Sequence, residues 1–296
     1  MAKIIDGKQV AADLRAEIAE RTKALAAKGK IPGLGVILVG DDPASHSYVR
    51  GKEKACEKAG IKSKDFRLSE DTSEEILIEH VESLNKDPEI HGILVQLPLP
   101  KHINEQNVLL AIDPKKDVDG FHPVSIGKMV LGQETFFPCT PHGILKLLEI
   151  SGIEVPGKHA VILGRSNIVG KPVANLLLQK GAHTNATVTV CHTGTKDIPS
   201  FTRNADILIV AAGRPGMVTG DMVKEGAVVI DVGVNRIPDN SKKKGYRLTG
   251  DVDFESVEKK AGFITPVPGG VGPMTITMLL YNTLISCEQS KPKGAE

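Results

Sequence analysis

The sequence contains no tryptophan, and aromatic residues make up only 3% of its 296 residues. A stacking surface for single-stranded nucleic acid needs several exposed aromatic rings, so this composition argues against such a function. An excess of charge of one sign is also lacking, because 37 basic residues face 36 acidic ones, for a formal net charge of +1. A protein with this balance has no broad positive field to attract nucleic acid or an anionic membrane. We therefore exclude polyanion binding as the main function and expect a small-molecule partner.

Cysteine is scarce, and no two cysteines form a C-x-x-C pair; the four are Cys56, Cys139, Cys191 and Cys287. This spacing indicates neither a zinc knuckle nor a redox dithiol, so we expect reduced thiols and no bound metal. No uninterrupted apolar run approaches the roughly 18 residues that a membrane-spanning helix needs. The first residues also lack the apolar core of a secretory signal. We expect a cytoplasmic protein.

Short apolar runs, typical of strands that are buried on both faces of a parallel sheet, recur along the chain. They are residues 35–40, 93–97, 160–164, 187–190, 206–210 and 227–231. Most are separated by segments with near-helical apolar spacing, such as residues 8–28. Strands and helices that alternate in this way predict an α/β fold with mostly parallel sheets. At about 150 residues per domain, the length favours two such domains.

The segment from Asp113 to Pro141 interrupts this alternation with several glycine and proline residues, so we place a domain boundary near it. Thr140 and Pro141 are predicted to cap and begin a helix over residues 142–150. The mostly apolar residues 274–287 predict a final helix that returns to the first domain. The expected domains are therefore residues 1–139 with 274–296, and residues 140–273.

A glycine-bearing turn, residues 164–172, joins the predicted strand 160–163 to a predicted helix. Such a turn directs backbone N–H groups and the positive helix end toward one point, where a phosphate can bind. The spacing departs from G-x-G-x-x-G, so a simple tight turn is the alternative interpretation.

The next predicted strand ends in Cys-His-Thr-Gly-Thr-Lys at residues 191–196, without the carboxylate that commonly binds the ribose 2′-hydroxyl of NAD. Arg165 and Thr193 can instead donate hydrogen bonds to a 2′-phosphate. This pattern favours NADP over NAD. His192 is either a ligand contact or a surface residue at the end of the strand.

Tyr48 and Lys52 follow the first predicted strand and would share one face of a helix, one turn apart. A phenol beside an ammonium group can serve as an acid and base pair, because burial lowers the pKa of lysine. The alternative is an ordinary surface lysine. Gln96 lies at the carboxyl end of the strand over residues 93–95, where ligands bind in open α/β sheets, and its amide could orient Lys52.

Asp119 lies in Lys-Asp-Val-Asp-Gly, residues 116–120. One carboxylate can accept two parallel N–H donors from the edge of an aminopyrimidine. The alternative is an aspartate that caps its own turn before Gly120, which is the more frequent use of Asp-Gly.

Five motifs, in one order along nearly the whole chain, resemble the bifunctional methylenetetrahydrofolate dehydrogenase/cyclohydrolases, the FolD family. They are Tyr-Val-Arg-Gly-Lys at 48–52, Val-Gln-Leu-Pro-Leu-Pro at 95–100, Lys-Asp-Val-Asp-Gly at 116–120, the turn 164–172, and the glycine- and proline-rich residues 265–275. The resemblance implies oxidation of 5,10-methylenetetrahydrofolate with NADP, and then hydrolysis of the methenyl product to 10-formyltetrahydrofolate. It also implies a Rossmann-type second domain and an active-site cleft between the two domains.

By this resemblance, Lys52 transfers the proton in the hydrolysis, Tyr48 positions the folate, Gln96 holds the lysine, and Asp119 binds the pterin edge. Further folate contacts are implied for Val95, Leu97, Gly269, Gly270, Val271 and Gly272. The implied contacts to NADP are Gly164, Arg165, Ser166, Thr193 and Val234. A homodimer through the nucleotide-binding domain is implied as well.

Two departures from the family bear on the nucleotide. The family more often has serine at the position of Thr193, and residues 181–185 lengthen the turn before the strand at 187, which keeps NAD open. Three other functions remain as alternatives: a dehydrogenase without the hydrolytic step, a nucleotide-sensing module without catalysis, and a hydroxy-acid dehydrogenase.

Overall fold

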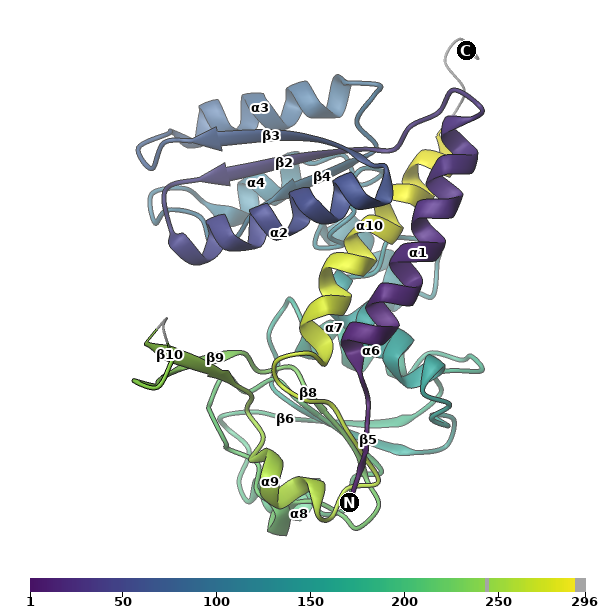
Figure 1. The fold of residues 1–296 in the computed structure, drawn as a ribbon, viewed down its shortest axis with the longest axis vertical. Coiled ribbons are helices and arrows are strands. Elements are labelled where there is room, and N and C mark those ends of the chain that lie inside the picture. Colours follow the sequence, from purple (N-terminus) through teal and green to yellow (C-terminus); the bar gives the residue numbers. More distant parts are fainter. Residues whose placement is uncertain (243–244, 291–296) are drawn as a thin grey trace. The chain divides into compact units, whose positions relative to one another are not determined.

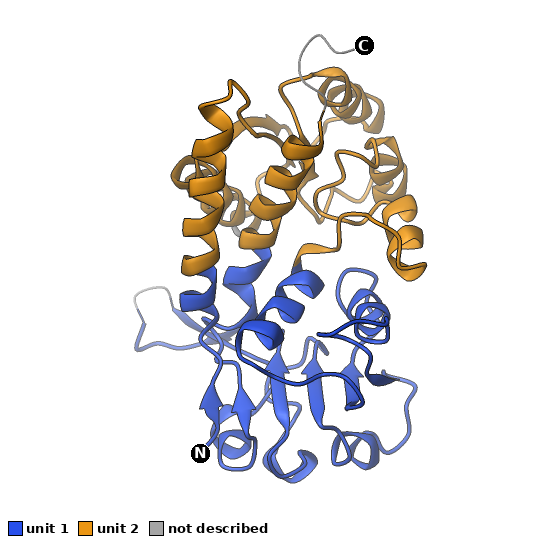
Figure 2. Ribbon diagram, turned by 90° about the vertical axis from the view of Figure 1, so that its right-hand side faces the viewer, with its two compact units in different colours: residues 1–11, 140–275 blue, residues 12–139, 276–296 orange. Residues whose placement is uncertain are grey.

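The computed structural model describes residues 1–242 and 245–290 (Figure 1). The chain divides into two compact units: unit 1 comprises residues 1–11 and 140–275, and unit 2 comprises residues 12–139 and the C-terminal segment from Ile276 (Figure 2). Each unit contains its own parallel sheet. The predicted α/β fold with mostly parallel strands is confirmed.

The sheet of unit 1 has six strands in the order β1-β11-β8-β7-β5-β6, and all neighbours are parallel. Their bounds are β1 (Lys3–Ile4), β5 (His159–Leu163), β6 (Thr187–Cys191), β7 (Ile207–Val210), β8 (Val228–Asp231) and β11 (Phe263–Ile264). The chain leaves β5 for β6 on one side and then continues to β7 on the other. The carboxyl ends of β5 and β7 therefore form a topological switch point, which is where α/β sheets bind ligands.

The other elements of unit 1 surround this sheet. They are α6 (Cys139–Ile150), α7 (Gly170–Leu177), α8 (Ile198–Thr202), the 3₁₀ helix η1 (Gly220–Met222), α9 (Phe254–Glu258), and a hairpin of β9 (Asn235–Pro238) and β10 (Tyr246–Thr249). Buried aliphatic side chains from β5, β7, β8 and β11 form the core of the unit.

The sheet of unit 2 has three parallel strands, β3 (Lys62–Leu68), β2 (Gly33–Val39) and β4 (Gly92–Val95), with β2 in the centre. All seven residues of β2 are buried, as its apolar run predicts. The sequence did not predict β3, because a strand is recognised from apolar residues and this one, Lys-Ser-Lys-Asp-Phe-Arg-Leu, is mostly charged or polar. As an edge strand, β3 exposes its charged side chains, while Phe66 and Leu68 pack against the core of unit 2.

Four helices lie wholly within unit 2: α2 (Pro43–Ala59), α3 (Glu74–Lys86), α4 (Glu105–Ala111) and α5 (Pro123–Val130). Local signals set the ends of α2. Asp42 accepts the N–H of Ser45 at 2.7 Å, Pro43 occupies the first turn, and Gly60 ends the helix with φ of +71°. Two further helices, α1 (Gly7–Ala26) and α10 (Val271–Gln289), carry the chain from one unit into the other, as does α6, whose first residue, Cys139, belongs to unit 2.

Three boundaries differ from the sequence predictions. Residues 1–11 belong to unit 1, not to the first predicted domain, because β1 pairs with β11; a two-residue strand is too short for a periodic pattern. The helix α6 begins at Cys139, so Thr140 lies inside its first turn, and the hydroxyls of Thr140 and Thr275 are 2.8 Å apart. The last helix begins at Val271 instead of residue 274. Residues 291–296, which the predicted first domain includes, lie outside the described residues.

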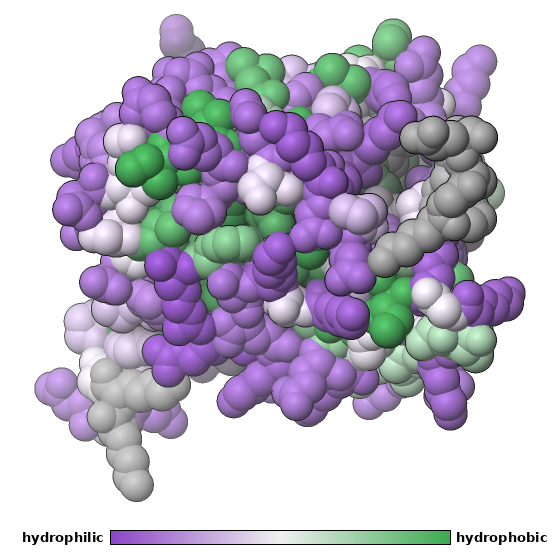
Figure 3. Space-filling view, turned by 90° about the horizontal axis from the view of Figure 1, so that it is seen from above, coloured by the Kyte–Doolittle hydropathy of each residue, from purple (hydrophilic) through white to green (hydrophobic). Residues whose placement is uncertain are grey.

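Figure 3 shows one face on which hydrophilic residues predominate and hydrophobic residues occur in separate groups. Within residues 1–242 and 245–290, no helix combines the length and the apolar character needed to cross a membrane.

Gly7, the first residue of α1, packs directly against the backbone at Gly270. A Cβ atom at residue 7 would lie 1.8 Å from the carbonyl oxygen of Gly270, so we expect Gly7→Ala to force a backbone shift. Overpacking of this kind costs on the order of 1–3 kcal/mol, and thermal denaturation should show a lower midpoint. The control is Gly127→Ala in α5, where no atom lies within 4 Å of the added Cβ. Its midpoint should be unchanged or higher. Equal midpoints for the two variants would contradict the close approach.

Candidate functional site

Lys52 projects from the middle of α2 and is only 7% exposed. Its Nζ donates a hydrogen bond to Oε1 of Gln96 at 2.9 Å. The other end of that amide is also held, since Nε2 of Gln96 donates to the carbonyl of Leu97 at 2.7 Å. The structure therefore brings Lys52 and Gln96 together and orients the amide so that its oxygen faces the lysine.

The charge of Lys52 is poorly solvated. Burial lowers the pKa of Lys52 below the usual range of lysine, and the negative charge of Asp119 opposes this shift. Tyr48 lies one helical turn earlier on α2 and has 48% of its surface exposed. The arrangement provides a lysine that can change protonation state, beside an exposed aromatic ring.

Asp119 reaches this cluster because the preceding residues run beside β4. The N–H of Ile93 donates to the carbonyl of Lys116 at 2.8 Å, and Ile93 and Asp117 form a parallel bridge. Burial raises the pKa of Asp119, and the positive charge of Lys52 lowers it. The thiol of Cys139 also interacts with the Asp119 carboxyl.

The turn at Gly120 is capped by Asp117 rather than by Asp119. One Asp117 oxygen accepts the N–H groups of Gly120 and Phe121 at 3.1 and 3.2 Å, and the other accepts that of His122 at 2.8 Å. The alternative interpretation of Asp119 as the cap of its own turn is therefore wrong.

The remaining predicted folate contacts lie in two places. Val95 is buried at the end of β4, and Leu97 follows it, half-buried. Gly269 and Gly270 are buried in the turn before α10, Val271 is the first residue of that helix, and Gly272 is exposed. These four belong to unit 1, whereas Lys52, Gln96 and Asp119 belong to unit 2.

A cavity of about 290 Å³ lies at the switch point of the unit 1 sheet, at the carboxyl ends of β5, β6 and β7. Of the predicted nucleotide contacts, Gly164, Arg165 and Thr193 line it. Among the described residues that line it there is no aspartate or glutamate; they are Leu163, Gly164, Arg165, Cys191, His192, Thr193, Ile198, Ala211, Ala212, Arg214 and Met217. A cavity with two arginines and no carboxylate suits an anionic ligand.

The turn at residues 164–172 needs its two glycines, because the backbone packs closely around both. A Cβ on Gly164 would lie 2.2 Å from the carbonyl oxygen of Ala211, and one on Gly170 would lie 2.2 Å from that of Gly164. This tight turn allows backbone N–H groups to approach a phosphate. The residues present therefore fit a phosphate-bearing nucleotide.

Two predicted contacts do not line this cavity. The hydroxyl of Ser166 accepts the N–H groups of Val169 and Gly170 at 3.1 and 3.3 Å, so it is bound to the backbone just before α7 and at its first residue. Val234 follows β8 and is 50% exposed. Direct contacts of Ser166 and Val234 with a nucleotide remain predictions.

His192 lines the cavity with a fixed ring orientation. Its Nδ1 accepts the N–H of Gly194 at 3.1 Å, so the neutral ring carries its proton on Nε2. That second nitrogen is then a donor, and a contact of His192 with a ligand remains a prediction.

Arg214 and Asp251 were missed by the sequence analysis. Arg214 lies in Ala-Ala-Gly-Arg-Pro-Gly, a glycine-bearing turn that follows the buried strand β7. The same pattern, a glycine-bearing turn after a buried strand, predicted the nucleotide site at residues 164–172, so it could have pointed to Arg214 too. The fully buried Asp251 holds this loop, because its Oδ2 accepts the N–H groups of Ala212 and Gly213, each at 2.7 Å. No sequence signal pointed to Asp251, since its partners are distant in the chain.

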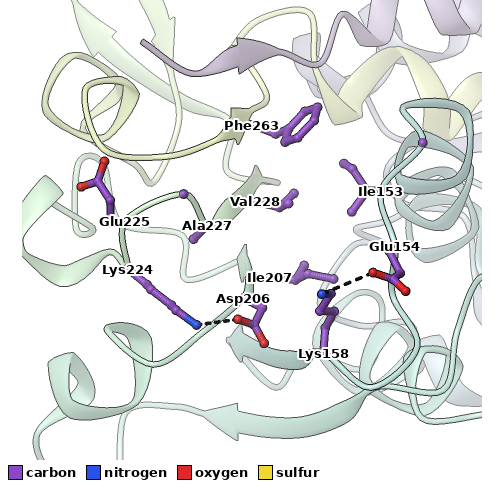
Figure 4. A pocket seen from close by; sticks show the side chains of 12 residues that line it. Ile153, Glu154, Lys158, Asp206, Ile207, Lys224, Glu225, Ala227, Val228 and Phe263 are labelled. Carbon is purple, nitrogen blue, oxygen red and sulfur yellow. Dashed lines mark hydrogen bonds and ion pairs between the residues drawn. The ribbon is translucent and has the colours of Figure 1, made fainter.

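A second cavity of unit 1, of about 340 Å³, lies at the opposite, amino ends of the strands (Figure 4). Its two lysines are already paired, Lys224 with Asp206 at 2.6 Å and Lys158 with Glu154 at 3.4 Å. None of the predicted site residues lines this cavity. The part of the chain that the structure describes also has no cluster of His, Cys, Asp and Glu side chains suited to a metal ion.

Two family models match the chain: the catalytic domain of tetrahydrofolate dehydrogenase/cyclohydrolase over residues 5–119, and the NAD(P)-binding domain over residues 138–291. The chain belongs to the tetrahydrofolate dehydrogenase/cyclohydrolase family. The family predicted from the five motifs is thus confirmed, as is a nucleotide-binding second part.

Relatives match nearly the whole chain. The bifunctional protein FolD of Chlorobium limicola is 60% identical over 97% of this chain and 98% of its own. The crystal structure of bifunctional FolD from Campylobacter jejuni, 50% identical, matches with a TM-score of 0.92 over 97% of this chain and 99% of its own. The Trypanosoma brucei FolD structure, described as complexed with NADP cofactor and inhibitor, is 44% identical with a TM-score of 0.92 over 97% and 98% of the two chains.

The Asp251 carboxylate should stabilise the loop that lines the cavity of unit 1. Asp251→Ala leaves the N–H groups of Ala212 and Gly213 without their acceptor, which costs on the order of 1–3 kcal/mol for a buried donor. We expect a lower thermal midpoint and weaker nucleotide binding, measured by calorimetry. The control is Asp221→Ala, whose carboxylate is 72% exposed, and it should change neither quantity. Unchanged nucleotide affinity in Asp251→Ala would show that the loop does not depend on this residue.

Proposed function

We propose that this protein oxidises 5,10-methylenetetrahydrofolate to the 5,10-methenyl compound with NADP and then hydrolyses that compound to 10-formyltetrahydrofolate. The observation that carries the proposal is the buried Lys52, held by Gln96 at 2.9 Å and facing the charge of Asp119. The names of the relatives support both activities, since the Chlorobium limicola protein is called bifunctional and the Trypanosoma brucei enzyme a dehydrogenase-cyclohydrolase.

The hydrolytic step needs a group that can take a proton near neutral pH. Water attacks the cationic methenyl carbon and loses a proton to the neutral amine of Lys52. The bond from that carbon to N5 then breaks, and the hydroxyl proton passes to N5, so one proton is released overall. Burial lowers the pKa of Lys52, and the nearby cationic carbon lowers it further, which makes the neutral amine accessible. The oxygen of Gln96 keeps the amine in place.

The oxidation step depends on positioning. NADP, when bound at the cavity lined by Gly164, Arg165 and Thr193, would supply the acceptor for the hydride of the methylene carbon, and the chain's own residues would align the folate with it. We propose that Tyr48 stacks on the folate and that Asp119 accepts the N–H donors of its aminopyrimidine edge. Val95, Leu97 and the segment Gly269–Gly272 complete the folate contacts in this proposal.

We propose NADP rather than NAD as the nucleotide. Arg165, Thr193 and His192 supply donors at the cavity of unit 1, and no described lining residue carries a negative charge that would repel a 2′-phosphate. Threonine keeps the hydroxyl of the serine that is commoner in the family, which supports the same contact.

An absorbance time course with 5,10-methylenetetrahydrofolate, run in parallel with NADP and with NAD, tests the function. We expect NADPH to form with little accumulation of the methenyl compound, and a much slower reaction with NAD. Accumulation of the methenyl compound would leave only the dehydrogenase. No reaction with either nucleotide would favour a nucleotide-sensing module.

Lys52→Met should abolish hydrolysis of the methenyl compound while folate binding is retained, because methionine fills the space but carries no proton. The wild-type rate should rise with pH through a pKa below the usual range of lysine, because the neutral amine is the active form. The matched control is Lys54→Met, an exposed lysine on the same helix, which should keep both the rate and its pH dependence. Ordinary hydrolysis by Lys52→Met would refute the assignment.

We also propose that the protein forms a homodimer through unit 1 and works in the cytoplasm. β6 is an edge strand of the unit 1 sheet, with Val190 37% exposed, and an open edge can pair with a second copy. The four cysteines are free thiols, which agrees with a reducing compartment.

Val190→Lys should convert the dimer to a monomer, because it places a charge on the proposed interface; light scattering coupled to size-exclusion chromatography measures the mass. Ile4→Lys is the control, since Ile4 is 42% exposed on β1, the opposite edge of the same sheet. It should leave the mass unchanged. A wild-type monomer, or dissociation by Ile4→Lys instead, would contradict the proposal.

A further inference from the structure

Asn282 is a buried amide in α10, with 2% of its surface exposed, and it joins three segments of unit 2. Its Nδ2 donates to the carbonyl of Val118 at 2.8 Å and to the carbonyl of Phe137 at 3.2 Å. The sulfur of Cys139 lies 3.9 Å from the same nitrogen. A single NH₂ group therefore holds α10, the turn at residues 118–120 and the segment at residues 137–139 together.

These contacts enclose Asp119. Val118, which directly precedes it, is held by Asn282. Gly120, which directly follows it, has φ of +76° and packs so tightly that a Cβ would lie 2.5 Å from the nitrogen of Pro138. The turn and the segment at 137–139 are thus in backbone contact, and the Asn282 amide bridges the carbonyl groups of both.

The side chain of Asp119 depends on the same segment. Its carboxyl interacts with the thiol of Cys139, whose sulfur also contacts the carbonyl oxygen of Val118 at 3.4 Å. A displacement of residues 137–139 would therefore move both the backbone of the turn and a partner of the Asp119 carboxyl. The charge of Asp119 also interacts with that of Lys52, so such a displacement would affect the lysine as well.

We propose that Asn282 is a positioning residue that aims the Asp119 carboxylate at the folate. The inference rests on the proposed function, in which Asp119 binds the aminopyrimidine edge. An amide suits the task because both of its N–H donors can face carbonyl oxygens. Leucine has similar size without donors, so Asn282→Leu removes the two hydrogen bonds and leaves the packing largely in place.

The test measures hydrolysis of the methenyl compound and nucleotide binding in Asn282→Leu. Displacement of a substrate-binding group by about 1 Å can cost 10²-fold. We expect KM for the folate to rise about tenfold or more, with a smaller change in kcat and an unchanged Kd for the nucleotide. If Asn282→Leu does not fold, Asn282→Ser, which keeps one donor, is measured in the same way with the same expected direction.

Ser286→Ala is the matched control. Ser286 lies one turn later on α10 and is 8% exposed. Its hydroxyl oxygen likewise lies within hydrogen-bond distance of two backbone carbonyl oxygens, those of His91 at 2.5 Å and Lys115 at 3.2 Å. These carbonyls do not adjoin Asp119. We expect Ser286→Ala to lower the thermal midpoint about as much as Asn282→Leu does. Its KM for the folate should nevertheless change by less than about twofold, because a general loss of stability does not displace Asp119.

A double-mutant cycle with Asp119→Ala separates positioning from a merely structural role. If Asn282 acts through Asp119, Asn282→Leu should raise KM by less than about twofold in the Asp119→Ala background. The inference would be overturned if the two substitutions raised KM for the folate independently, so that their factors multiply in the double variant. An unchanged KM in Asn282→Leu, or an equal rise in Ser286→Ala, would overturn it as well. If the proposed function itself is wrong, the wild-type protein will not hydrolyse the methenyl compound. That result is distinct from a failure of the inference about Asn282, in which the wild type is active.

Discussion

The burial of the Lys52 ammonium is the constraint on which the rest of unit 2 depends. A lysine with 7% exposure loses most of its hydration, so the protein must supply an acceptor and a counter-charge. Gln96 supplies the acceptor at 2.9 Å, and Asp119 supplies the charge. An uncharged acceptor leaves the pKa of Lys52 low, whereas a carboxylate in direct contact would keep it protonated. The same constraint makes the lysine both costly to bury and useful as a base.

The parallel sheet explains how these three residues meet. Lys52 comes from the helix after β2, Gln96 follows β4, and Asp119 ends a segment that runs beside β4. Carboxyl ends of neighbouring parallel strands lie at one edge, so polar side chains that follow them converge there. Unit 1 repeats this geometry at β5, β6 and β7, where the cavity combines Arg165, His192 and Arg214. In both sheets the candidate site residues therefore lie at the carboxyl ends of the strands.

Buried polar groups hold the functional loops of both units. The Asp117 carboxylate accepts three N–H groups of the turn after Asp119. The Asn282 amide donates to the carbonyl oxygens of Val118, which precedes Asp119, and of Phe137. In unit 1, Asp251 takes two N–H groups of the loop that carries Arg214. A loop that is fixed by hydrogen bonds to a buried side chain presents its neighbours in one arrangement, which is what ligand binding requires.

The sequence by itself determined the α/β class, six of the parallel strands and the family, because apolar runs and motifs are local or contiguous features. It also placed Lys52 and Gln96 where they could meet, since the carboxyl end of a strand is visible in the pattern. Only the tertiary structure decided that Asp117 and not Asp119 caps the turn, and that β1 joins the sheet of unit 1. It alone showed Asp251 and Asn282 as anchors. These contacts join residues far apart in the chain, and no periodicity or spacing records which buried polar groups will satisfy one another.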